Sequence, residues 1–293
     1  MVHIAKPPDP DTAAPKLVCP PGAVDSHLHL FGPASEYPFV ADSLYVSGDA
    51  LPESCIAMHD VLGIDHGVIV SGGAYGRDPR HLLDMLRRFP GRFRGVAVPP
   101  DHLEIDEISV MHELGVRGVR FVSNARGKHL PRILPGLAAR IDEFGWHVQF
   151  YPNGTDLTDY ADRLLALPND IVLDHFGSMP AALGVDQAAF RTVLRMLDSG
   201  RVWVKLSGPM YCSTQEFPYA DMTPFAHALV RHAPERLVWG SDWPHLHMKE
   251  RAMPNDGPLL DLLLGWVPDE LARNRILVDN ARKLYDFDAR THS

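Results

Sequence analysis

The sequence contains 293 residues and carries a formal net charge of −9, which argues against a basic surface for nucleic acid. Hydrophobic residues make up 45% and charged residues 22%, the composition of a soluble globular protein. No apolar run approaches the roughly 20 residues that a membrane-spanning helix needs. We therefore expect a protein that contacts neither nucleic acid nor a membrane. Its oligomeric state is left open by the sequence.

The N-terminal segment and the cysteines bear on the cellular compartment. Residues 1–21 are rich in Pro, Ala and Lys and have no apolar core, unlike a secretory signal. The three cysteines, Cys19, Cys55 and Cys212, lie far apart without metal-finger spacing. A sparse, odd number of cysteines is typical of a reducing compartment, so we expect a cytoplasmic protein.

Eight short apolar runs indicate buried strands. Each run is continuous rather than alternating, as is usual for parallel strands that are covered on both faces. The runs are residues 23–26, 67–71, 93–98, 118–122, 147–151, 171–174, 202–206 and 237–240.

Helical patterns separate these runs. Apolar residues recur at helical spacing in residues 79–89, 104–114, 138–144 and 186–197. Glycines that suit left-handed C-terminal caps follow these segments, namely Gly91, Gly115, Gly145 and Gly200. The alternation of strands and helices implies right-handed crossovers and a parallel sheet.

Eight strands of this kind predict an α/β fold, a (β/α)8 barrel of the TIM type. The competing open sheet needs a glycine-rich phosphate turn after its first strand, and this chain has His-Leu-His-Leu-Phe-Gly-Pro there. The glycine-rich residues 71–76 follow the second strand, and we expect them to form a tight loop near the functional end. We assign residues 1–293 to a single barrel domain, with an N-terminal extension over 1–20 and C-terminal helices within 243–293.

The most distinctive motif is His27-Leu28-His29-Leu30, at the end of the first strand. Strand side chains alternate in direction, so His27 and His29 leave the same face and converge on one point. Two imidazoles placed in this way can hold a metal ion or donate hydrogen bonds to an anionic transition state. The alternative is a pair of core histidines that are satisfied by backbone carbonyls.

Polar residues also end four other strands. Arg120 ends strand four, Tyr151 ends strand five, His175 follows strand six, and Asp242 and His245 follow strand eight. In a barrel the carboxyl ends of the strands carry the catalytic residues. A core strand has no packing reason to end in such residues, so this rim is expected to be an active site.

These motifs resemble the amidohydrolase superfamily. The resemblance rests on the two histidines of Ala-Val-Asp-Ser-His-Leu-His, the histidine of Val-Leu-Asp-His-Phe-Gly and the aspartate of Val-Trp-Gly-Ser-Asp-Trp-Pro-His. The segments PPGAVDSHLHLFGP, GVRGVRF and NARKLY are similar to the lactonase branch, which includes 2-pyrone-4,6-dicarboxylate lactonase, 4-sulfomuconolactone hydrolase and galactarolactone isomerase. The similarity extends over residues 20–285 and implies the distorted barrel of that superfamily.

The resemblance implies that His27, His29, His175 and Asp242 are the catalytic residues. Asp242 would act as the general base on an attacking water and return the proton to the leaving alkoxide. The three histidines would polarise a lactone carbonyl, either directly or through a single zinc ion held by the same four residues. Strands four and five offer no good ligand for a second metal, so the cofactor is either none or one divalent metal ion.

Asp242 also has a purely structural interpretation. Aspartate often caps the helix that follows it, and Pro244 suits the start of a helix. Capping and catalysis need not exclude each other.

The resemblance further implies a small anionic lactone as substrate. Arg120 and Arg126 match arginines of the pyrone lactonase, and guanidinium groups bind carboxylates bidentately. Tyr45 and Tyr151 match tyrosines of that enzyme's site. His245 would contact either the general base or the substrate.

Two differences from the pyrone lactonase narrow the range of expected substrates. Where that enzyme has arginines after strands six and seven, this chain has Ser178 and residues 207–211. We therefore expect a lactone of the muconolactone, pyrone or sugar-acid type other than 2-pyrone-4,6-dicarboxylate, within aromatic or sugar-acid catabolism. Asp242 favours hydrolysis because an attacking water needs a base. An isomerase of an aldaric acid lactone and a metal-dependent decarboxylase are the alternatives.

Overall fold

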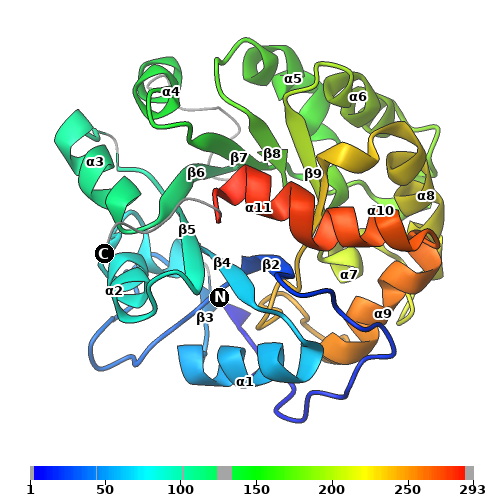
Figure 1. Cartoon of the computed structure of the whole chain (residues 1–293), viewed down its shortest axis with the longest axis horizontal. Helices are drawn as coiled ribbons and strands as arrows, with labels where there is room; N and C mark the ends of the chain where they lie inside the picture. The colour runs from blue at the N-terminus through cyan, green and yellow to red at the C-terminus, as the bar shows by residue number, and fades with distance from the viewer. Residues whose placement is uncertain (1–2, 44, 101, 124–133, 288–293) are drawn as a thin grey trace.

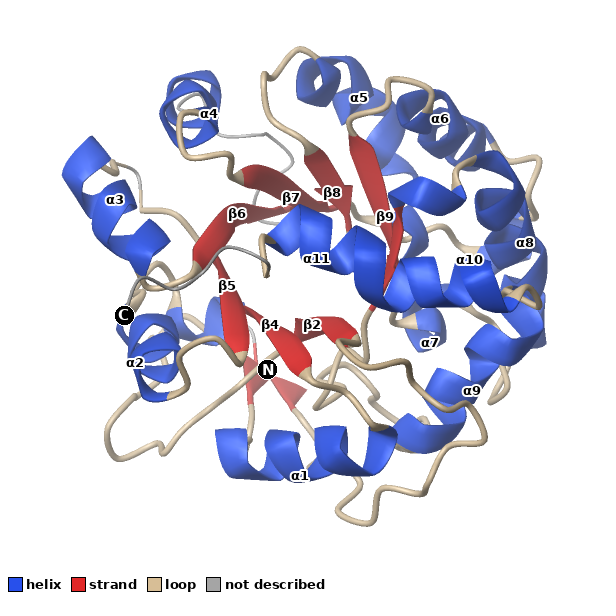
Figure 2. Cartoon of the chain, viewed as in Figure 1, coloured by secondary structure: helices blue, strands red, loops and turns tan. Residues whose placement is uncertain are grey.

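A computed structural model of the chain describes residues 3–43, 45–100, 102–123 and 134–287. Eight parallel strands follow one another around a ring in sequence order, with helices outside them (Figures 1 and 2). This arrangement confirms the predicted TIM-type barrel. The strands are β2 (Val24–Leu28), β4 (His66–Val70), β5 (Phe93–Ala97), β6 (Val116–Val122), β7 (His147–Tyr151), β8 (Ile171–Leu173), β9 (Val202–Leu206) and β10 (Leu237–Trp239).

The ring is nearly closed where the first and last of these strands meet. The backbone N–H of Asp242 donates to the carbonyl of His27 at 2.8 Å, and the N–H of His29 donates to the carbonyl of Trp243 at 2.8 Å. Gly240 permits this approach, because a Cβ at that position would lie 2.7 Å from the Cβ of His27. The closure therefore brings the His27–His29 motif beside Asp242.

The helices surround the ring, and each of the four expected helices is present. One of them, α4, begins about a turn earlier than expected, because Pro135 is tolerated in a first helical turn. The helices are α1 (Pro52–Leu62), α2 (Arg80–Arg88), α3 (Ile105–Glu113), α4 (Leu134–Asp142), α5 (Leu157–Leu165), α6 (Ala188–Leu197), α7 (Pro209–Cys212), α8 (Thr223–His232), α9 (Asp256–Trp266), α10 (Glu270–Asn274) and α11 (Asn280–Tyr285). None of the described helices is long and apolar enough to span a membrane.

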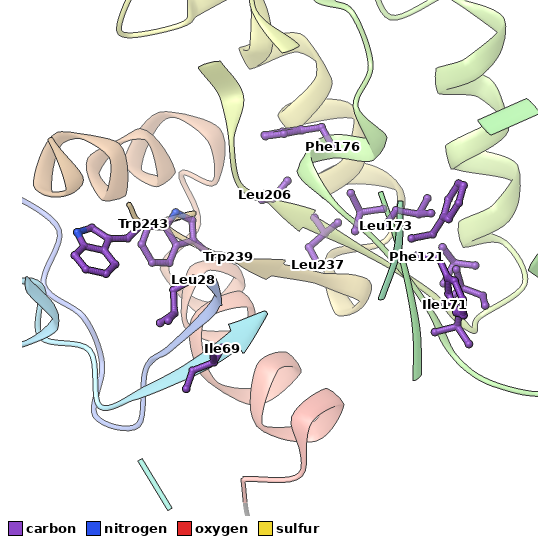
Figure 3. Close-up of a cluster of buried hydrophobic side chains, with 14 of the residues drawn as sticks. Leu28, Ile69, Phe121, Ile171, Leu173, Phe176, Leu206, Leu237, Trp239 and Trp243 are labelled. Atoms are coloured by element: carbon purple, nitrogen blue, oxygen red, sulfur yellow. The ribbon is translucent and has the colours of Figure 1, made fainter. Parts of the chain in front are cut away.

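Alternating strand residues build two apolar layers. Ile69 packs in the larger cluster, part of which is shown in Figure 3, whereas its neighbours Val68 and Val70 belong to a smaller cluster with Trp203. Residues of α11 join the smaller cluster, and this helix crosses the barrel in Figure 1. The side-chain amide of Asn280 donates to the carbonyl of Leu237 at the start of β10, so α11 covers the amino-terminal end of the strands.

The N-terminal extension adds a small second sheet. Its strand β1 (His3–Ile4) pairs in parallel with β3 (Tyr45–Val46). The ring of His3 lies 2.8 Å from the carbonyl oxygen of Leu246, and Lys6 donates to the carbonyl of Arg251. The extension therefore rests on the segment that follows β10.

Candidate active site

A cavity of about 580 Å³ opens at the carboxyl-terminal end of the strands. Its walls carry most of the polar residues that were expected at this rim, because the strands of a parallel barrel all end on the same side. Lining residues include His29, Tyr45, Gly73, Arg120, Tyr151, His175, Tyr211, Asp242 and His247. The presence of Gly73 places the glycine-rich loop beside this cavity.

Asp242 lies at the centre of the site. Its Oδ1 atom is 3.5 Å from Nε2 of His27 and 3.6 Å from Nε2 of both His29 and His175. Its Oδ2 atom accepts a hydrogen bond of 2.7 Å from the hydroxyl of Tyr211. The structure thus brings together the four residues that were predicted to be catalytic, and it adds a tyrosine that was not.

The backbone is constrained at two of these residues. Asp242 has a φ of 64° and His175 a φ of 49°, in the left-handed region that non-glycine residues rarely adopt. Such conformations cost on the order of 1–3 kcal/mol each and cluster at functional sites. No helix begins in residues 243–255, so Asp242 is not a helix cap, and its position is explained by the site.

The remaining ring nitrogens hold two of the histidines in place. Nδ1 of His29 lies 2.7 Å from the carbonyl oxygen of Val70, which can only accept, so this nitrogen carries the proton. In the neutral ring, Nε2 of His29 is then an acceptor that faces a carboxylate oxygen. Two facing acceptors leave a place for a donor such as a water molecule. Nδ1 of His175 lies 2.9 Å from the hydroxyl of Ser207, which can donate or accept.

Lys205 is a site residue that the sequence analysis missed. It lies on β9, is fully buried, and reaches Nδ1 of His27 at 3.2 Å. Burial lowers the pKa of Lys205 to about 8 against the opposing effect of Asp174, so the side chain is an ammonium group at neutral pH. The signal was present in the sequence, because a lysine interrupts the otherwise apolar run of residues 202–206.

Asp174 joins this lysine to the binding wall. Its carboxylate accepts from Nε2 of Gln149 at 2.8 Å and from Nε of Arg120 at 2.9 Å, and it lies 3.2 Å from Nδ1 of His27. Burial alone would raise the pKa of Asp174, but His27, Arg120 and Lys205 outweigh it and hold the pKa well below its usual range. A buried, ionised network therefore lies directly beneath the cavity.

The catalytic groups have definite charge states at neutral pH. Burial by itself raises the pKa of Asp242, but the neighbouring imidazoles, His175 foremost, lower it well below its usual range, so this carboxylate is ionised. Burial lowers the pKa of His27 and of His175, so both rings are neutral. An ionised base beside neutral imidazoles is suited to general-base chemistry.

Three of the four residues predicted to hold a metal ion are close enough together to do so. Ligand atoms of His27, His175 and Asp242 lie within 4.8 Å of one another, and this donor set suits zinc, but His29 is not in the group. Nε2 of His27 has no hydrogen-bond partner among the described residues. However, an ammonium that donates to Nδ1 leaves the proton on Nε2, and a protonated nitrogen cannot ligate a metal. A metal bound through His27 therefore fits only the tautomer whose proton lies on Nδ1, where Asp174 is also 3.2 Å away.

Three of the residues expected to bind substrate line the cavity. They are Tyr45, Arg120 and Tyr151, and the guanidinium of Arg120 lies 5.2 Å from the centre of the Tyr151 ring. Burial raises the pKa of Tyr45 to about 12, so its hydroxyl stays protonated at neutral pH. Arg126, the other expected arginine, lies outside the described residues.

His245 is not among the residues that line the cavity. Its side chain is fully buried, and its Nε2 lies 3.1 Å from Oδ1 of Asp256 rather than in the cavity wall. The left-handed backbone at His245, with a φ of 63°, takes the chain out of strand alternation there. His247 lines the cavity instead, and burial lowers its pKa to about 4. The repeated His-Leu-His at residues 245–247 was a signal for this second histidine.

The fold and the site together define a class of protein. The structure is an eight-stranded parallel barrel with three histidines and an aspartate at its carboxyl-terminal rim, where barrel enzymes carry their active sites. The amidohydrolase family model matches residues 24–287. The chain belongs to the amidohydrolase family.

Individual relatives place the chain in the lactonase branch. It is 36% identical to a 2-pyrone-4,6-dicarboxylate hydrolase of Comamonas testosteroni, over 92% of each chain. It is 35% identical to a 4-sulfomuconolactone hydrolase of Rhizobium radiobacter, over 91% of this chain and 90% of the relative. It is 31% identical to a D-galactarolactone isomerase of Agrobacterium fabrum, over 93% and 94%. A crystal structure of an Agrobacterium tumefaciens protein superposes with a TM-score of 0.85 at 30% identity, covering 93% of this chain and 98% of that one.

Proposed function

We propose that this protein hydrolyses an anionic lactone, with Asp242 as the general base. The observation that carries the proposal is the position of Asp242 Oδ1, which three imidazole nitrogens face at 3.5–3.6 Å in the cavity floor. Two relatives that are named as hydrolases of lactone-type substrates support the reaction class.

In the proposed reaction, Asp242 takes a proton from a water molecule that is also held by Nε2 of His29. The water oxygen attacks the lactone carbonyl, whose developing negative charge is stabilised by His27 and His175. When the tetrahedral intermediate collapses, the ring C–O bond breaks, and Asp242 returns the proton to the leaving alkoxide. The product is a hydroxy acid, and the enzyme regains its starting protonation state.

Arg120 supplies the contact for the anionic group of the substrate. Because its described hydrogen bond to Asp174 uses Nε, the two terminal nitrogens remain a fork for a carboxylate or sulfonate. Ser178 and Tyr211, from the two segments that lack the arginines of the pyrone lactonase, line the same cavity. These neutral residues favour a muconolactone or sugar-acid lactone over a planar dicarboxylate. Arg126 stays a predicted second anion contact.

Lactone isomerisation is the competing reaction, because one relative is named as a galactarolactone isomerase. In that reaction a hydroxyl group of the substrate would replace water as the nucleophile. The central position of Asp242 beside a place for a water molecule favours hydrolysis.

A screen of carboxylated and sulfonated lactones in heavy-oxygen water tests the proposal. We expect ring opening with heavy oxygen in the new carboxylate, detected by mass spectrometry, and no ring opening by the Asp242→Asn variant. An unlabelled isomeric lactone would establish isomerisation instead, and release of carbon dioxide would establish decarboxylation. If the wild-type protein opens none of these lactones, the proposed function is wrong.

A further inference from the structure

The buried ammonium of Lys205 has three N–H donors to satisfy. Two of them have acceptors at 2.9 Å, namely the carbonyl of Ser26 and Oε1 of Gln149. The nearest remaining acceptors are Nδ1 of His27 at 3.2 Å and Oδ1 of Asp174 at 3.6 Å. Only the histidine nitrogen is within hydrogen-bond distance, so the third donor is directed to His27.

We infer that Lys205 sets the tautomer of His27 by donating to Nδ1, so that His27 presents a protonated Nε2 toward Asp242. Among the described residues, the contacts of Lys205 include none that lines the cavity, so Lys205 acts through His27. It is therefore a positioning residue.

A second arrangement competes for the same histidine. Nδ1 of His27 is also 3.2 Å from Oδ1 of Asp174, and a proton shared there would make a carboxylate–histidine pair of the kind that supports metal ligands. That arrangement would leave the third donor of Lys205 facing only Asp174 Oδ1 at 3.6 Å, beyond hydrogen-bond distance in a fully buried place, which is costly. Asp174 already accepts from Gln149 and Arg120, so it does not need the histidine proton. Satisfaction of the three donors of Lys205 therefore favours donation by Lys205 to His27.

The inference separates the roles of the two motif histidines. Nδ1 of His29 donates to a backbone carbonyl, so its Nε2 is an acceptor in the neutral ring, whereas Nε2 of His27 is a donor. If the proposed lactone chemistry holds, His27 stabilises the carbonyl oxygen and His29 holds the water. The tautomers themselves do not depend on which substrate is used.

The wild-type protein provides the first test. Nitrogen NMR on protein labelled at histidine distinguishes the two tautomers, and the signal of His27 is assigned by its loss in His27→Asn. We expect a protonated Nε2 and an unprotonated Nδ1 at neutral pH. A protonated Nδ1 on His27 would overturn the inference, whatever the activity of the protein.

The second test removes the donor. In Lys205→Met, His27 is free to adopt the other tautomer, in which Nδ1 carries the proton and donates to Asp174 and Nε2 presents a lone pair beside His175 and Asp242. We expect the affinity for zinc to rise by about 10- to 100-fold, measured by calorimetric titration with zinc chloride. The expected rise should vanish in the double variant that also carries His27→Asn.

Val204→Ala is the matched control, because it removes core volume from the same strand without touching His27. Its zinc affinity should equal that of the wild type. The inference fails if the wild type binds zinc as tightly as Lys205→Met, or if the gain survives in the double variant. If Lys205→Met does not fold, Lys205→Gln and the wild-type NMR measurement still decide the tautomer. Neither readout uses a lactone, so failure here is distinguishable from failure of the proposed function.

Discussion

The two sides of the cavity are built in different ways. On the catalytic side, Asp242 and His175 have left-handed backbones, and buried groups satisfy the ring nitrogens that point away from the cavity. On the binding side, Arg120 and Tyr151 come from the ends of β6 and β7 in ordinary strand conformation and present side chains to the cavity. The catalytic side is therefore determined by backbone and buried hydrogen bonds, which tolerate little change. The shape of the binding side depends on the parts of side chains that face the cavity. A substitution there is expected to change which substrate is preferred and to leave the chemistry intact.

The largest effect is expected from the catalytic side. Asp242→Asn keeps the shape of the side chain but removes the carboxylate that accepts the proton of water. We expect kcat to fall by roughly 100- to 10,000-fold with an unchanged far-ultraviolet circular dichroism spectrum. Retention of full turnover by this variant would show that another group is the base.

A binding-side change should act on KM. Arg120→Lys keeps the positive charge but loses the planar fork, so we expect KM for an anionic lactone to rise by about 10- to 100-fold. Arg87→Lys on the outer surface of α2 is the control, because Arg87 is half-exposed and pairs only with Asp84 among the described contacts. A fall in kcat without a change in KM would place Arg120 on the catalytic side instead.

Two tyrosines allow a direct comparison of the sides. Tyr211→Phe removes the hydrogen bond that holds Asp242 Oδ2, and we expect kcat to fall about tenfold, within the range for a bond to a charged group. Tyr151→Phe removes only a hydroxyl on the binding side, so KM should change by a few-fold at most. Steady-state kinetics of both variants on one substrate makes the comparison, and equal effects on kcat would remove the distinction.

The smallest expected effect concerns stability in acid. Burial lowers the pKa of His147 from 6.5 to about 3, so the unfolded chain binds a proton that the folded chain excludes. This group therefore lowers stability as the pH falls below 6.5, by about 1.4 kcal/mol per pH unit, until the folded-state pKa is reached. His147→Leu should lose less stability than the wild type between about pH 6 and about pH 4.5, measured by urea unfolding. An equal loss in both proteins would show that His147 titrates normally.

Strands were the most predictable part of the molecule. The runs at residues 147–151 and 202–206 coincide with β7 and β9, because strands buried on both faces need continuous apolar sequence. The residues predicted to be catalytic were singled out because their polar side chains interrupt that rule at strand ends. The two-residue strands β1 and β3 were missed, since so short a pairing has no periodic pattern.

Lys205 and His247 show where prediction from sequence ends. A lysine within a strand becomes informative only when the acceptors across the barrel are known, and these come from β2 and β7. His245 was predicted because it lies close to Asp242 in the sequence, and His247 was not predicted. Left-handed residues redirect the chain at that point, so distance along the sequence no longer reports distance to the cavity.

The small sheet of β1 and β3 has a consequence for how such enzymes diverge. The family match begins at residue 24, so His3 and Ile4 lie outside the part of the chain that defines the family. Yet β1 pairs with the strand of Tyr45 and lies against the segment of Leu246 and His247, all three of which line the cavity. The N-terminal segment thus supports part of the cavity wall, although it is more than 230 positions away from Leu246 in the sequence. Replacement or loss of a few residues of this segment would change the shape of that wall, and with it the substrate preference, while the barrel and its rim stay as they are.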